Sequence, residues 1–120
     1  MRRILIVEDN ENNLYLTKYI LEKNGYTTIA ASSGCEGVKK AIEEKPDLII
    51  MDIQLPDING LEATKMIRDS PVGNSIPIIA LTSYAMMGDK DKALKAGCSG
   101  YIEKPIDPEK FIYQIMEYLK

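Results

Sequence analysis

The stretch Leu48-Ile49-Ile50-Met51-Asp52-Ile53-Gln54-Leu55-Pro56-Asp57-Ile58-Asn59-Gly60 contains a short apolar run that ends on a carboxylate. The run at 48–51 is too short for a buried helix and lies between Pro46 and Pro56, which is typical of a strand buried on both faces of a parallel sheet. Asp52 then lies at the carboxyl edge of that strand, where open α/β sheets bind ligands. An aspartate here can also cap a turn or a helix, and this stretch alone does not choose between the two roles.

Apolar runs suited to strands alternate along the chain with segments suited to helices. The expected strands lie at 4–7, 27–31, 48–51, 76–81 and 101–102, and the expected helices at about 11–24, 35–44, 60–69, 87–96 and 108–119. Asn10 or Glu11 can cap the first helix, Gly25 can end it, and Asp107-Pro108 can open the last one. The alternation predicts an α/β fold, a doubly wound five-stranded parallel sheet with helices on both sides.

The first and last helices each have an apolar stripe that should pack on this sheet. In the first helix the stripe consists of Leu14, Leu16, Ile20 and Leu21. In the last helix it consists of Phe111, Ile112, Ile115, Met116 and Leu119. Tyr15 and Tyr19 of the first helix then point away from the sheet and lie side by side on the outer surface, because they are four residues apart.

Length and composition exclude several classes of protein. The 120 residues suit one domain, so we expect a single domain over residues 1–120 with no output domain. The net charge of −3 and the scattered basic residues argue against direct nucleic-acid binding. The apolar start at 4–7 is far too short for a signal peptide or a membrane span, so we expect a cytoplasmic protein without a membrane partner. Cys35 and Cys98 stand far apart in a chain without histidine, so we expect two small buried residues and neither a zinc site nor a disulfide.

Glu8-Asp9 follows the first strand directly, as Asp52 ends the third. Taken singly, Glu8 and Asp9 are more often solvated residues whose negative charge interacts favourably with the positive N-terminus of the next helix. If the strand order reverses beside the first strand, however, both edges are neighbours and three carboxylates converge. Because crowded like charges raise one another's pKa and cost stability, such a cluster usually binds a cation, and an all-oxygen set of few ligands suits Mg²⁺.

Thr82-Ser83 and Lys104-Pro105 bring further polar groups to the same edge, after the fourth and fifth strands. Alone, Thr82 could simply bond backbone and Lys104 could be a surface lysine. Beside a carboxylate and a hard cation, a hydroxyl and an ammonium form a site for the equatorial oxygens of a transferring phosphoryl group. Asp52 is then a nucleophile that forms an aspartyl phosphate.

Four motifs, in this order and spacing, resemble the response-regulator receiver domain of two-component signalling. They are Glu8-Asp9-Asn10, Met51-Asp52-Ile53-Gln54-Leu55-Pro56 with Gly60, Ala80-Leu81-Thr82-Ser83 and Tyr101-Ile102-Glu103-Lys104-Pro105-Ile106. The resemblance covers the whole chain and is strongest to single-domain regulators. It implies the flavodoxin-like receiver fold with strand order 2-1-3-4-5, in which a phosphoryl group is accepted and Mg²⁺ is bound at the carboxyl edge of the sheet.

The resemblance assigns a role to each residue of the site. Asp52 is the phosphoacceptor, and Glu8, Asp9 and the backbone carbonyl of Gln54 hold or orient Mg²⁺. Because Glu8 stands where chemotaxis regulators usually have aspartate, Asp9 is the more direct ligand.

Three further features come with the family. Thr82 and Lys104 contact the phosphoryl group, and Tyr101 is the aromatic switch residue that moves with Thr82. The peptide bond between Lys104 and Pro105 is expected to be cis, a conformation that is uncommon even before proline.

The function that the resemblance implies is a phosphorylation-dependent signalling switch. The donor is a phosphohistidine of a sensor histidine kinase or a histidine phosphotransfer protein, and the signal passes to a downstream protein target or by onward phosphotransfer. Tyr15 and Tyr19, beside the loop that carries Glu8 and Asp9, are the expected docking site for the donor. The chain is then no enzyme beyond catalysis of its own phosphorylation and dephosphorylation.

Three other classes of protein compete with this interpretation. A haloacid-dehalogenase-type enzyme needs a second aspartate two residues after the nucleophile, where this chain has Gln54. A flavin-binding module needs a phosphate loop after the first strand, where Glu8-Asp9-Asn10-Glu11 would repel phosphate. A receiver fold that docks partners without phosphorylation is the closest alternative, although every reactive position is filled.

Overall fold

The computed structural model describes residues 2–71, 73, 75–82 and 89–119, and over this part of the chain five strands alternate with five helices. The elements are β1 (Arg3–Val7), α1 (Glu11–Lys23), β2 (Thr27–Ala31), α2 (Gly34–Glu44), β3 (Leu48–Asp52), α3 (Gly60–Arg68), β4 (Ile78–Thr82), α4 (Asp89–Ala96), β5 (Gly100–Glu103) and α5 (Pro108–Tyr118). All neighbouring strands are parallel, and their order is β2-β1-β3-β4-β5. The predicted fold class and strand order are confirmed.

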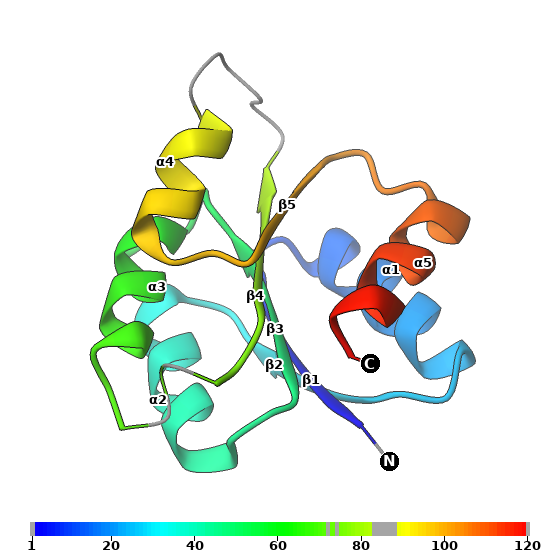
Figure 1. Cartoon of the computed structure of the whole chain (residues 1–120). Coiled ribbons are helices and arrows are strands. Elements are labelled where there is room, and N and C mark those ends of the chain that lie inside the picture. The colour runs from blue at the N-terminus through cyan, green and yellow to red at the C-terminus, as the bar shows by residue number, and fades with distance from the viewer. Residues whose placement is uncertain (1, 72, 74, 83–88, 120) are drawn as a thin grey trace.

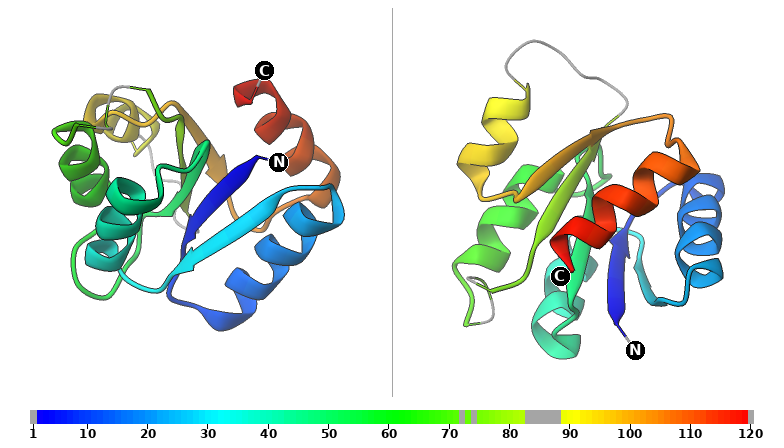
Figure 2. Two further views of the ribbon diagram at one scale, coloured as in Figure 1. Left: turned by 90° about the horizontal axis from the view of Figure 1, so that it is seen from below. Right: turned by 45° about the vertical axis from the view of Figure 1, so that its right-hand side comes forward.

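The helices form two layers, with α1 and α5 on one face of the sheet and α2, α3 and α4 on the other (Figure 1; the views in Figure 2 agree). Each face has its own core. Ile49 and Met51 of β3 pack toward the cluster under α2, α3 and α4, whereas Leu48 and Ile50 pack toward the cluster under α1 and α5. Since both faces of β3 are covered, its sequence is uninterruptedly apolar up to Asp52.

The predicted helix boundary signals act as expected. The Asn10 side chain accepts a hydrogen bond from the backbone N–H of Asn13 at 3.0 Å and so caps α1. Gly25 follows that helix with a φ of +94°, a conformation that glycine adopts without strain. Asp107 caps α5, and Pro108 occupies the first helical turn.

Two burial predictions for the helices are wrong. Leu16 is 43% exposed and Met116 is 48% exposed, although both were expected to face the sheet. The buried stripe of α1 is instead Thr17, Ile20 and Leu21, which follow the i, i+3, i+4 spacing and place Leu16 about 100° away on the flank. Met116 is turned away in the same manner, because Phe111, Ile115 and Leu119 form the buried stripe of α5.

Cys35 is exposed and Cys98 is buried, so the expectation of two buried cysteines holds only for Cys98. Cys35 lies in the first turn of α2, which faces solvent there, whereas Cys98 lies between α4 and β5 in contact with Thr64.

Element ends differ from the predictions by a few residues. The fourth strand begins at Ile78 and not at 76, because Pro77 has no N–H to donate to the ladder. Residues 87 and 88 of the fourth predicted helix lie outside the described residues, and α4 begins at Asp89. None of the helices in the described segments has the length and apolarity needed to cross a bilayer.

Candidate functional site

The polar groups singled out in the sequence meet at the carboxyl edge of the sheet. Asp52 ends β3 and Thr82 ends β4, while Glu8 and Lys104 directly follow β1 and β5. Parallel strands end at one edge, and the order reverses between β1 and β3 because β2 lies on the far side of β1. Such a reversal leaves a crevice for ligands.

Three carboxylates converge at this edge of the sheet, as the sequence predicted. Glu8, Asp9 and Asp52 each offer an oxygen atom, and these atoms lie within 4.8 Å of one another. Glu8 and Asp52 are each only 2% exposed, whereas Asp9 is exposed to solvent. Burial raises the pKa of Glu8 to about 7, and the adjacent Asp52 adds to the rise while Lys104 opposes it. Negative charge on this cluster is therefore costly unless a cation lies beside it.

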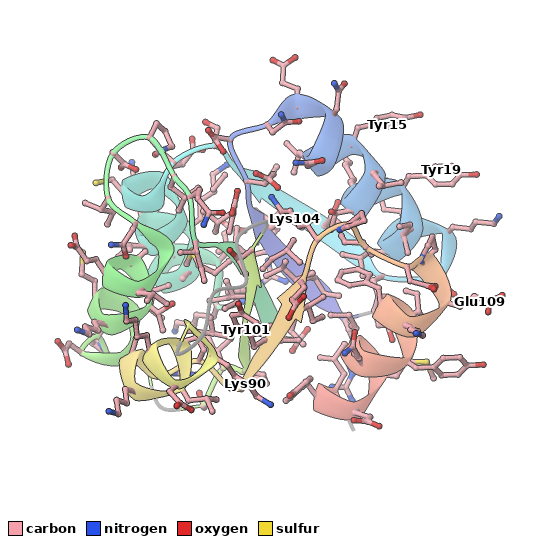
Figure 3. The ribbon with its side chains drawn as sticks, turned by 90° about the horizontal axis from the view of Figure 1, so that it is seen from above. Tyr15, Tyr19, Lys90, Tyr101, Lys104 and Glu109 are labelled. Carbon is pink, nitrogen blue, oxygen red and sulfur yellow. The ribbon has the colours of Figure 1, made fainter. Side chains whose placement is uncertain are left out.

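Lys104 neutralises part of this charge (Figure 3). Its Nζ lies 2.8 Å from Glu8 Oε1 and 3.3 Å from Asp52 Oδ2. Burial acts to lower the pKa of Lys104, but the ion pairs with Glu8 and Asp52 outweigh it and raise the pKa above its ordinary value. The Lys104-Pro105 peptide bond is cis, as the resemblance implied, and the Lys104 N–H donates to the Thr82 carbonyl at 2.7 Å.

Thr82 follows Leu81, the residue that pairs with Asp52 in the sheet, and is 1% exposed. Gln54 joins Thr82 to Asp52: its backbone N–H donates to Asp52 Oδ1 at 3.1 Å, and its side-chain Nε2 donates to Thr82 Oγ1 at 3.1 Å. Sequence reasoning considered only the backbone carbonyl of Gln54. It missed the side-chain contact, which spans 28 residues and follows from no local pattern.

The loop after β3 is fixed at both of its ends. Gly60 donates to the Ile53 carbonyl at 2.8 Å, and a Cβ atom at Gly60 would lie 2.2 Å from the Asp52 carbonyl oxygen. Asp57 accepts backbone hydrogen bonds from Gly34 and Cys35 at the start of α2, each at 2.8 Å. The hydrogen bonds from the Cys35 side chain and backbone hold the pKa of Asp57 well below its usual range. The sequence did not predict these hydrogen bonds between Asp57 and the start of α2.

The donor set of the cluster suits a hard divalent cation. Its ligand atoms are carboxylate oxygens, two of the three side chains are withdrawn from water, and the third faces solvent. Mg²⁺ in proteins takes one or two carboxylates and keeps several waters, an arrangement for which the exposed side leaves room. The residues present therefore fit the ion that the sequence predicted.

The expected switch and docking residues lie outside this cluster. Tyr101 is half-buried in β5 beside Ala80 and packs against the core under α2, α3 and α4. Tyr15 and Tyr19 are 71% and 53% exposed, and their rings stack with centroids 6.4 Å apart. Figure 3 shows both rings projecting from α1 away from the sheet, as predicted.

A groove of about 540 Å³ runs beside these rings, between α1 and the start of α5. Its lining includes Leu16, Tyr19, Lys23, Ile112 and Tyr113. The exposure of Leu16, which contradicted the sequence prediction, thus adds apolar surface to the tyrosine pair.

Comparison with known proteins identifies the relatives of this arrangement. A family model described as the response regulator receiver domain matches residues 4–116. The polar-differentiation response regulator DivK of Brucella ovis is 47% identical over 118 residues, which are 98% of this chain and 96% of that protein. A CheY-like response regulator receiver domain protein from Methanospirillum hungatei JF-1 has a similar crystal structure, with a TM-score of 0.90 and 36% identity over 99% of this chain and 94% of that one.

A further solved structure bears on the acidic cluster. The receiver domain of a sensor histidine kinase from Pseudomonas aeruginosa PAO1 matches with a TM-score of 0.92 and 34% identity, over 98% of this chain and 97% of that one. In that crystal structure a magnesium ion is coordinated in the active site cleft.

Proposed function

Because the chain belongs to the family of response regulator receiver domains, we propose that it is a phosphorylation-dependent signalling switch whose phosphoacceptor is Asp52. The observation that carries this proposal is the environment of Asp52. Asp52 is 2% exposed at the end of a buried strand, and its carboxylate lies 3.3 Å from the Lys104 ammonium and accepts a backbone hydrogen bond from Gln54. A rigid strand thus presents one carboxylate beside a cation, at an edge where a ligand can approach.

The reaction needs a nucleophile and a neutralised phosphoryl group. A carboxylate oxygen of Asp52 attacks the phosphorus of a phosphohistidine donor, a phosphorus–oxygen bond forms, and the phosphorus–nitrogen bond breaks as the imidazole leaves with a proton. Lys104, already beside Asp52, contacts the transferred oxygens. Glu8, Asp9, Asp52 and the backbone carbonyl of Gln54 would hold Mg²⁺, which when bound neutralises charge on the transferring group.

The switch couples this chemistry to the surface. We propose that Thr82 turns its hydroxyl toward the phosphoryl group on Asp52 and that the Tyr101 ring shifts into the space that becomes available. Thr82 and Tyr101 lie on adjacent, paired strands, so that a small displacement of one side chain can be passed to the other. A change of this kind is a population shift between two packed arrangements.

The stacked pair Tyr15 and Tyr19 is the proposed docking site for a protein phosphodonor, a sensor histidine kinase or a histidine phosphotransfer protein. Both rings are exposed on the helix that follows the Glu8-Asp9 loop, and Tyr19 borders an apolar groove. Exposed aromatic groups that can be buried on association have the composition of interface hot spots.

Replacing Tyr15 and Tyr19 by alanine should slow phosphotransfer from the protein donor and leave phosphorylation by a small-molecule donor unchanged. Met66→Ala, which removes a 48% exposed side chain from α3 on the opposite layer, is the matched control and should slow neither reaction. Unaltered transfer from the protein donor in the double variant would exclude this docking site.

Incubation with a small-molecule phosphodonor, in Mg²⁺ and in chelator, tests the proposed function by intact-mass measurement. We expect one phosphoryl group on the protein in Mg²⁺ and little or none in chelator. Absence of incorporation in both conditions would contradict the proposal and favour a phosphorylation-independent docking module on the same fold.

A further inference from the structure

The side chain of Gln54 contacts the proposed switch residue and not only the metal-binding edge. The amide nitrogen Nε2 lies 3.1 Å from Thr82 Oγ1, and the amide oxygen Oε1 lies 3.5 Å from the same atom. Among the described residues, Thr82 is the hydrogen-bond partner of this amide, which bridges the loop after β3 to the last residue of β4. The side chain therefore acts on Thr82 independently of the backbone carbonyl of Gln54.

The position of Thr82 makes this contact significant. Thr82 is 1% exposed, and its backbone carbonyl accepts a hydrogen bond from Lys104. Since the main chain is held in the sheet, the hydroxyl can move chiefly by rotation of its own side chain. For the proposed switch, rotation of Oγ1 toward a phosphoryl group on Asp52 is taken to break the hydrogen bond with the Gln54 amide, which then belongs to the resting arrangement.

We propose that the Gln54 side chain is a positioning residue that latches Thr82 in its resting arrangement and thereby sets how readily the switch responds. This inference rests on the proposed function, because it takes Thr82 as the group that contacts the phosphoryl moiety. One neutral hydrogen bond that is present in one state and absent in the other changes the ratio of the two states by about fivefold. The latch therefore tunes the resting population of the switched state and does not abolish switching.

Gln54→Met is the appropriate variant, because methionine keeps the length of the side chain, has no strong hydrogen-bonding group, and leaves the backbone carbonyl in place. Gln54 is exposed, so the substitution creates no cavity in the core. Gln114→Met, at an exposed position of α5, is the matched control.

The probe is beryllofluoride, a phosphoryl mimic, titrated in Mg²⁺ into the full chain with the ¹³C-labelled methyl group of Thr82 as the NMR reporter. We expect Gln54→Met to bind beryllofluoride about fivefold more tightly than the wild type does. Before any beryllofluoride is added, the Thr82 methyl signal of this variant should already lie closer to the bound-state position. Gln114→Met should match the wild type in both measurements.

Two results would overturn the latch. Equal affinity with an unshifted Thr82 signal would show that the hydrogen bond has no effect on the switch, and weaker binding by Gln54→Met would show that the amide assists the switched state. Both of these results can be obtained only if the wild-type protein binds beryllofluoride. Failure of the wild type itself to bind it would instead count against Asp52 as phosphoacceptor, so the two failures are distinguishable.

Discussion

The substitution Glu8→Gln removes a carboxyl group that the fold buries beside two other carboxylates. Glu8 is 2% exposed, and burial raises its pKa from 4.5 to about 7. The folded protein consequently binds a proton at Glu8 more tightly than the unfolded chain does. This contribution to stability is fully present below pH 4.5 and is lost as the pH rises through about 7.

The size of the effect follows from the two pKa values. The difference between 4.5 and about 7 corresponds to roughly 3 kcal/mol of unfolding free energy, and about 2 to 3 kcal/mol of it should disappear between about pH 5 and pH 8. No such change is expected from a neutral amide, so the pH dependence should weaken in Glu8→Gln.

Urea unfolding followed by circular dichroism, in chelator and across this pH range, measures the effect. The wild type should lose about 2 to 3 kcal/mol relative to Glu8→Gln as the pH rises. Glu43→Gln, the same chemical change at an exposed position of α2, should follow the wild type. Parallel stability curves for wild type and Glu8→Gln would refute the idea that the fold raises the pKa of Glu8.

Three further outcomes are expected. Asp9→Asn should melt at or above the wild-type temperature in chelator, because it relieves repulsion, whereas Mg²⁺ at 100 times its Kd should stabilise the wild type by about 2.7 kcal/mol and the variant much less; equal gains in thermal melts would exclude Asp9 as a ligand. Thr82→Ala should still accept phosphate from a small-molecule donor but gain less affinity for a downstream partner, and a full gain in a binding titration would disprove the coupling. Gly60→Ala should cost about 2 kcal/mol or more in urea unfolding, because its Cβ would lie 2.2 Å from a backbone oxygen of Asp52, and wild-type stability would disprove this close approach.

The fold and the location of the site could be predicted because the sheet is buried on both faces. In such a sheet, hydrophobic runs such as 48–51 identify the strands, and the first polar residue after a run marks the edge where ligands bind. Glu8, Asp52, Thr82 and Lys104 each stand at such a boundary, so their convergence followed from the strand order alone.

The features that could not be predicted depend on how elements are rotated and on contacts between distant residues. Leu16 and Met116 lie on helix flanks, where a small rotation about the helix axis decides between core and solvent. The Gln54 contact with Thr82 joins residues 28 positions apart. The hydrogen bonds of Asp57 to the start of α2 join residues 22 and 23 positions apart. Neither contact leaves a periodic pattern, and both side chains are of a kind that is common in loops.

Phosphoryl incorporation into Asp52→Asn, followed by intact-mass measurement in Mg²⁺ with a small-molecule donor, tests the identity of the phosphoacceptor most directly. Asparagine has nearly the same shape as aspartate but its amide does not attack phosphorus, so the variant should remain unmodified. Asp69→Asn, at an exposed position at the end of α3, should be phosphorylated like the wild type. Incorporation into Asp52→Asn at the wild-type level would contradict the assignment and place the acceptor at another residue.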